Sequence, residues 1–143
     1  MKKTMGWVLM MLIGNGLLYG QDSLYTVSGK IFFEKEGNIY VSMTTESQFM
    51  NKDASPTRRC VLSTSADSTD TEWVTFEFDS LVAGEYVISA FQDVNGNGKL
   101  DMGWKGPKEP YGFSGPRPRF MPKFNDLKFE VGQSVCDMMI NLE

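Results

Sequence analysis

The feature that most constrains this chain is the two-residue alternation of apolar side chains along its length. The segment 24–33 places its apolar residues on one face, and after a short turn near 36–38 the pattern resumes in the segment 39–43. It returns in the segment 72–78. Alternation with one apolar face is typical of strands in an antiparallel sheet that has one buried side. The residues expected to face a core are Val27, Gly29, Ile31, Phe33, Ile39, Val41, Met43, Val74, Phe76 and Phe78.

Further strands are predicted at 85–92, 125–131 and 134–142, and a shorter one at 60–62 within a polar excursion between residues 44 and 70. Tyr86 follows a leucine and a turn glycine in L-V-A-G-E-Y. This order is typical either of the tyrosine corner of immunoglobulin-like sandwiches or of an ordinary hairpin with a core tyrosine. The sequence therefore predicts an all-β, antiparallel β-sandwich of about seven strands, with a long irregular loop at 93–124.

The first 20 residues have the composition of a secretory signal peptide. Lys2 and Lys3 precede an apolar run of about 14 residues, which is shorter than the roughly 20 needed to span a bilayer. The alternative is a buried N-terminal helix. No cysteine lies near the expected cleavage after Gly20, so a lipid anchor is not indicated. We therefore expect a signal peptide at 1–20, one domain at 21–143, a periplasmic or secreted location and no membrane span in the mature chain.

Charge and composition exclude several functions. Removal of Lys2 and Lys3 leaves 12 basic against 18 acidic residues, a net charge of −6, which makes nucleic acid an unfavourable partner. The chain has no histidine. Catalysis by Ser-His-Asp or Cys-His groups and zinc binding through histidine are thereby excluded.

The stretch D-V-N-G-N-G-K-L-D at residues 93–101 has the spacing of a calcium loop. EF-hand loops place oxygen ligands at alternate positions, a glycine at the sixth and a backbone carbonyl at the seventh. The corresponding positions are Asp93, Asn95, Asn97, Gly98, the carbonyl of Lys99, and Asp101 at the ninth. The simpler alternative is a polar hairpin turn, since N-G pairs favour turns.

Two features of this loop depart from an EF-hand. The preceding residues alternate like a strand rather than a helix, and Trp104 occupies the twelfth position where a bidentate glutamate is expected. Glu109 is the nearest carboxylate that could return to the loop, since glycines at 103 and 106 permit a turn. We therefore expect structural Ca²⁺ bound by Asp93, Asn95, Asn97, Lys99, Asp101 and Glu109.

The segment 102–124 combines five of the six prolines with aromatic and basic residues. Its prolines predict no regular strand or helix. One interpretation is a surface that binds a carbohydrate or peptide, and the other is a loop whose rings cover the end of the sandwich. The candidate ligand-binding residues are Trp104, Tyr111, Phe113, Arg117 and Arg119.

Export to an oxidising compartment permits a disulfide between the two cysteines, Cys60 and Cys136. The alternative is two separate thiols, since Cys136 has the same strand parity as Met138, Ile140 and Leu142, and so is expected in the core.

Together, L-V-A-G-E-Y, D-V-N-G-N-G-K-L-D and G-P-K-E-P-Y-G-F-S resemble the bacterial exported proteins of domain of unknown function family 2141. The resemblance extends from about Thr26 to Leu142. It implies a prealbumin-like β domain outside the cytoplasm, without supplying catalytic residues or settling the metal.

These observations favour a non-enzymatic domain with a calcium-ordered loop that is structural or adhesive at the cell envelope, where its partner is a protein or a glycan. The alternative is a carbohydrate- or peptide-binding module that uses the aromatic residues of 104–124. An enzyme would need a carboxylate pair such as Asp101 and Glu109 as acid and base, and the metal-ligand role explains these residues better.

Overall fold

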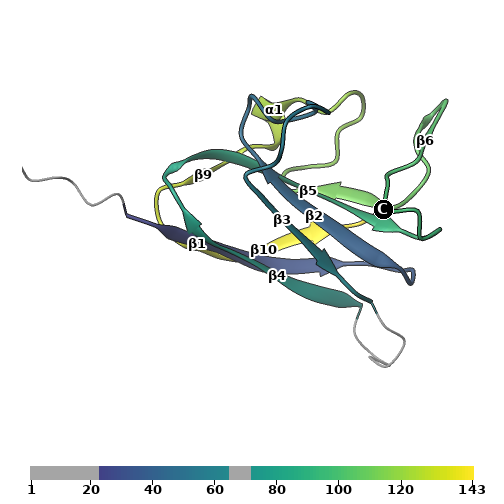
Figure 1. Ribbon diagram of the computed structural model, residues 1–143, viewed down its shortest axis with the longest axis horizontal. Helices are drawn as coiled ribbons and strands as arrows, with labels where there is room; N and C mark the ends of the chain where they lie inside the picture. The colour runs from purple at the N-terminus through teal and green to yellow at the C-terminus, as the bar shows by residue number, and fades with distance from the viewer. Residues whose placement is uncertain (1–22, 65–71) are drawn as a thin grey trace, which may run out of the picture.

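The computed structural model describes residues 23–64 and 72–143. Two β-sheets pack face to face, and a short helix and several loops lie on the outer side of the larger sheet (Figure 1). In chain order the elements are β1 (Tyr25–Phe32), β2 (Asn38–Thr44), β3 (Arg58–Leu62), β4 (Trp73–Leu81), β5 (Gly84–Asp93), β6 (Met102–Gly103), β7 (Gly106–Pro107), β8 (Tyr111–Phe113), α1 (Phe124–Leu127), β9 (Phe129–Val131) and β10 (Val135–Asn141).

The smaller sheet has the order β10-β1-β4, in which β1 pairs parallel with β10 and antiparallel with β4. The larger sheet has the order β3-β2-β5-β8, all antiparallel, and β9 pairs with the first residues of β5. A separate hairpin joins β6 to β7. The predicted all-β sandwich is confirmed.

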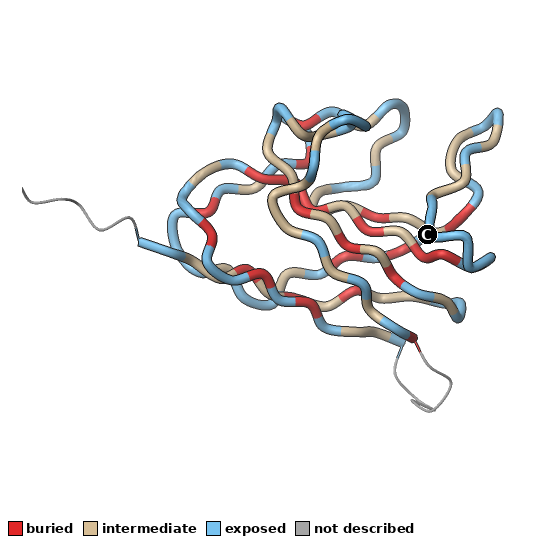
Figure 2. Tube along the Cα trace, viewed as in Figure 1, coloured by how far each residue is buried: buried red, intermediate tan, exposed pale blue. Residues whose placement is uncertain are grey.

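The core lies between the two sheets and is made by the inward positions of the alternating strands (Figure 2). The sequence predicts this face correctly for β1, β2 and the middle of β4. Burial of each large aliphatic or aromatic side chain contributes about 1.5–3 kcal/mol to the free energy of unfolding. The inward-facing side chains therefore supply most of the driving force for folding. Its fully buried members include Val27, Ile31, Ile39, Val41, Met43, Ile88 and Ile140.

Tyr86 ties the turn between β4 and β5 to the core. Its ring is buried, and its hydroxyl donates a hydrogen bond of 3.0 Å to the carbonyl oxygen of Val82, four residues earlier. The structure thus has the contact expected of a tyrosine corner.

Two segments differ from the sequence-based expectation. The proline-rich stretch contains the short β6–β7 hairpin, in which Pro107 takes part, and β8, whose residues 111–113 include no proline and pair with β5. The predicted strand 125–131 divides into α1 and the three-residue β9. Phe124 and Leu127 of α1 are buried three residues apart, as helical spacing requires, against Val87 on the outer face of β5.

A β-bulge in β10 changes the position of Cys136. The register between β1 and β10 shifts there, and Asp137 has a positive φ of 63°. The bulge turns Cys136 outward, so the expectation that it shares a face with Met138 is wrong. Cys60 is partly buried against the core.

The predicted Cys60–Cys136 disulfide is absent from the structure, in which both thiols are free. The strand order gives the reason. Cys60 lies on β3, which contacts β4 at one edge of the sandwich, whereas Cys136 lies on β10, which contacts β8 at the other edge.

The predicted signal peptide at 1–20 lies outside the described residues. Among residues 23–64 and 72–143, no helix has the length and apolar character needed to cross a membrane.

Candidate functional site

The candidate metal loop, residues 93–101, begins at Asp93, the last residue of β5. Asp93 is 3% exposed, and its carboxylate accepts three backbone hydrogen bonds. Oδ1 accepts from the N–H of Gly96 at 2.9 Å and of Asn97 at 3.1 Å, and Oδ2 accepts from the N–H of Gly98 at 2.7 Å. These hydrogen bonds offset the free-energy cost of burying the carboxylate charge. They also hold the backbone of the loop around the Asp93 side chain.

Two glycines make the bends that this wrapping requires. Gly96 has φ 75° and Gly98 has φ 74°, a left-handed conformation in which a side chain is strained. Gly98 is at the sixth position, where the calcium-loop spacing predicts the sharp turn.

The polar side chains at the third, fifth and ninth positions converge. The amide nitrogens of Asn95 and Asn97 donate to Asp101 Oδ2 at 2.6 Å and 3.0 Å. Their amide oxygens accept the backbone N–H of Asn97 at 3.1 Å and of Lys99 at 2.8 Å. The alternate positions thus form one polar cluster, which an ordinary two-residue hairpin turn does not need.

Glu109 returns to the loop, but its contacts are to backbone. Its side chain is 7% exposed, with Oε1 accepting the N–H of Val94 at 3.1 Å and Oε2 accepting the N–H of Asp101 at 3.2 Å. The N–H of Lys108 also donates to the carbonyl oxygen of Asp101 at 2.8 Å. Glu109 therefore fastens both ends of the loop together.

The carboxylate, amide and carbonyl oxygens of this loop are the kind of ligand that a hard cation prefers. The described residues contain no group of three or more His, Cys, Asp or Glu side chains placed to hold a metal ion. A cation in the loop would therefore depend on Asp101 and on amide and backbone oxygens, since both oxygens of Asp93 already accept backbone N–H groups.

A comparison with protein families identifies the family of this chain. The model of the family described as "Uncharacterized protein conserved in bacteria (DUF2141)" matches residues 30–138, most of the chain. The chain belongs to this family. The resemblance stated from the sequence motifs is thus confirmed. Neither the curated proteins nor the solved structures include a significant match.

In this DUF2141 domain, the aromatic residues predicted for ligand binding do not form one surface. Trp104, at the β6–β7 hairpin, is 92% exposed, and Lys105 Nζ lies 4.6 Å from its ring centre. Tyr111 and Phe113 lie instead on β8 and contact each other edge to face. Of the two interpretations of this segment, covering of the sheet holds for Phe113 and Phe124, which pack around Phe49.

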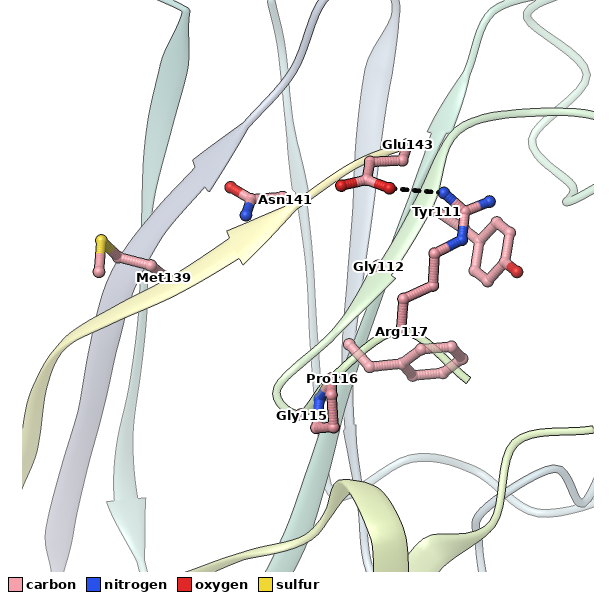
Figure 3. A pocket seen from close by; sticks show the side chains of 9 residues that line it. Tyr111, Gly112, Gly115, Pro116, Arg117, Met139, Asn141 and Glu143 are labelled. Atoms are coloured by element: carbon pink, nitrogen blue, oxygen red, sulfur yellow. Dashed lines mark hydrogen bonds and ion pairs between the residues drawn. The ribbon is translucent and has the colours of Figure 1, made fainter. Parts of the chain in front are cut away.

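The two predicted arginines differ in their contacts. Arg117 pairs with Glu143 at 2.8 Å and lies 5.1 Å from the Tyr111 ring centre, at the rim of a hollow of about 150 Å³ between β8 and β10 (Figure 3). The hydrogen bond that Arg117 donates to the Glu143 carboxylate raises the pKa of Arg117 above its already high ordinary value. Because Glu143 neutralises it, Arg117 is a weak candidate for an anion site. Arg119 is exposed.

A second polar and aromatic set, not predicted from the sequence, lies on the outer face of the larger sheet. It comprises Tyr40 and Ser42 on β2, and Ser89 and Phe91 on β5. Tyr40 and Ser42 occupy the outward positions implied by the alternation of 39–43, whereas no face was predicted for the residues of 85–92. The assembly of the set into one surface depends on strand order and register, which the alternation did not show.

Proposed function

We propose that this protein is an exported, non-enzymatic β-sandwich domain whose 93–101 loop binds calcium and serves a structural or adhesive role at the cell envelope. The observation that carries the proposal is the convergence of Asn95 and Asn97 on Asp101 Oδ2. Export is supported by the composition of residues 1–20.

Calcium is the ion best matched to these donors. The amide oxygens of Asn95 and Asn97 each accept one backbone N–H, and a carbonyl oxygen has a second lone pair. For a cation to bind Asp101, the amides of Asn95 and Asn97 would present their oxygens in place of the N–H groups that now face its carboxylate. Few charges in the loop imply weak binding, with a Kd on the order of 0.1–1 mM, as in extracellular calcium modules.

A non-enzymatic role is supported by the state of the carboxylates. A general base must have a free lone pair directed at substrate. Asp93 and Glu109 are buried and accept backbone N–H groups. Both carboxylates therefore hold the backbone of the loop. The chain has no histidine that could serve as a general base in their place.

The test is calcium binding by calorimetry together with thermal unfolding of the protein, lacking residues 1–20, at 0 and 10 mM Ca²⁺. An ion bound only by the folded state at ten times Kd adds about 1.4 kcal/mol to the free energy of unfolding. We expect Asp101→Asn to abolish this gain with little effect on stability without calcium. Asp93→Ala is a poorer probe, since it also removes three backbone hydrogen bonds.

The matched control is Asp79→Asn, the same change at an exposed position on β4. It should leave calcium binding unchanged. Absence of both heat and thermal shift for the unsubstituted protein would reject calcium binding, and an equal response to Mg²⁺ would reject selectivity for calcium.

A further inference from the structure

We propose that the outer face of the larger sheet carries a binding groove for a neutral saccharide. The groove encloses about 250 Å³ and is lined from β2, β5, β8 and the loops at either end. Figure 1 shows α1 and the β6–β7 hairpin rising on this same side of the sheet. The inference goes beyond calcium binding, because its principal residues lie on strands rather than in the metal loop.

One wall of the groove is a row of three aromatic residues on adjacent strands. The register pairs Tyr40 on β2 with Phe91 on β5, and Phe91 with Tyr111 on β8. The rings of Tyr40 and Phe91 stack with centres 5.0 Å apart and planes 6° apart. The outward positions next in register form the floor. These are Ser42 and Ser89, which are directly paired.

The opposite wall comes from the segment 45–50 that follows β2. Phe49 is held there by its backbone hydrogen bond to Thr45 and by edge contacts with Phe113 and Phe124. Met50 beside it is 61% exposed. Two short side chains between rows of large ones explain why the sheet is hollowed at Ser42 and Ser89.

The chemistry of the lining selects the ligand. No charged side chain lines the groove, so neither an anion nor a cation would find a partner for its charge. Among the lining hydroxyls, Thr44 Oγ1 is bonded to the carbonyl oxygen of Val87, whereas those of Ser42 and Ser89 have no hydrogen-bond partner among the described residues. A sugar ring matches this lining, because its C–H face packs on aromatic rings while its hydroxyl edge bonds to serine.

The metal loop lies at one end of the groove. Leu100 lines the groove, and a Cβ at Gly98 would stand 3.5 Å from the Tyr40 hydroxyl. The two sites are nevertheless separable by experiment, since calcium binding is read from its own heat and saccharide binding from ligand resonances.

The test uses saturation-transfer NMR and calorimetry with neutral hexasaccharides of glucose, mannose and N-acetylglucosamine, measured with calcium and with a chelator. We expect at least one of the three to bind. Ser42→Leu, which fills the floor, should weaken that binding by about tenfold or more, equivalent to about 1.4 kcal/mol. Phe91→Ala should also weaken it by removing the centre of the aromatic row.

Two controls localise the effect. Ser28→Leu makes the same change on β1, in the other sheet, and Trp104→Ala removes the exposed ring of the hairpin. Both should bind as the unsubstituted protein does, and circular dichroism should show that Ser42→Leu remains folded. Three outcomes would each overturn the proposal that this groove binds a saccharide, whatever the calcium result. These are failure of all three saccharides to bind, undiminished binding by Ser42→Leu, and loss of binding on Trp104→Ala alone.

Discussion

Glu109 Oε1 accepts the backbone N–H of Val94 at 3.1 Å, although the two residues are fifteen positions apart. Its second oxygen accepts the N–H of Asp101, so a single carboxylate holds the start and the end of the candidate metal loop. The same carboxylate is buried, which makes these contacts strong and their loss expensive.

Replacement of Glu109 by glutamine should lower the free energy of unfolding by about 1–3 kcal/mol, because an amide has only one oxygen and leaves one of the two partly buried N–H groups unpaired. Urea unfolding followed by circular dichroism measures this. Glu130→Gln, at an exposed position on β9, is the matched control and should change stability little. Equal stability of the two variants would show that Glu109 does not fasten the loop.

Tyr86→Phe should cost about 0.5–1.5 kcal/mol, the net value of one hydrogen bond, because the ring keeps its packing and only the contact to the Val82 carbonyl is lost. Tyr25→Phe removes a hydroxyl from another tyrosine at the margin of the core and should have a smaller effect. Chemical denaturation of both variants compares them. If Tyr25→Phe cost as much, the Val82 contact would not be the source of the effect.

Gly112→Ala should be strongly destabilising. A Cβ at Gly112 would overlap the carbonyl oxygen of Asn141, where β8 packs against the end of β10. Overpacking of this kind costs about 1–3 kcal/mol or more, because backbone must move. Gly132→Ala meets no atom within 4 Å and serves as control. Thermal unfolding that gives both variants the same melting temperature would contradict the close approach of β8 and β10.

The two thiols should differ in reactivity. Cys136 is exposed, whereas burial raises the pKa of the Cys60 thiol, so an alkylating reagent at pH 8 should modify Cys136 first. Mass spectrometry of timed samples measures the order, and a chain without free thiols would show a disulfide instead. Because the pKa of Cys60 is higher in the folded chain, its contribution to stability is complete below the unfolded pKa and declines as the pH rises above it.

The sequence predicted those parts of the fold that depend on local pattern. Alternation identified the inward faces of β1 and β2 because a half-buried strand repeats every two residues. It failed at Cys136, since one inserted residue in β10 reverses parity, and nothing local marks Asp137 as the site of a bulge. It also failed at β8, where neighbouring prolines concealed three residues able to pair with β5.

In the candidate site, too, the features set by local spacing were predictable and those set by distant segments were not. The bends at Gly98 and the convergence of Asn95 on Asp101 follow from spacing within nine residues, and were predictable. For Glu109, the sequence predicted only that the residue lies close to the loop. Whether its carboxylate meets backbone N–H groups or a cation depends on the path of the returning chain. The pairing of Tyr40 with Phe91 required the register of two distant strands.

The parallel pairing of β1 with β10 sets an order of events in folding. The two strands are separated by about a hundred residues of chain, and β1 is the central strand of its sheet. Closing so long a loop has an entropic cost, and this cost is compensated only when the contacts between the two strands form. Long-range pairing of this kind slows folding. The smaller sheet is therefore complete only once residues 135–141 have joined it, and until then the edge of β1 opposite β4 has no strand to pair with.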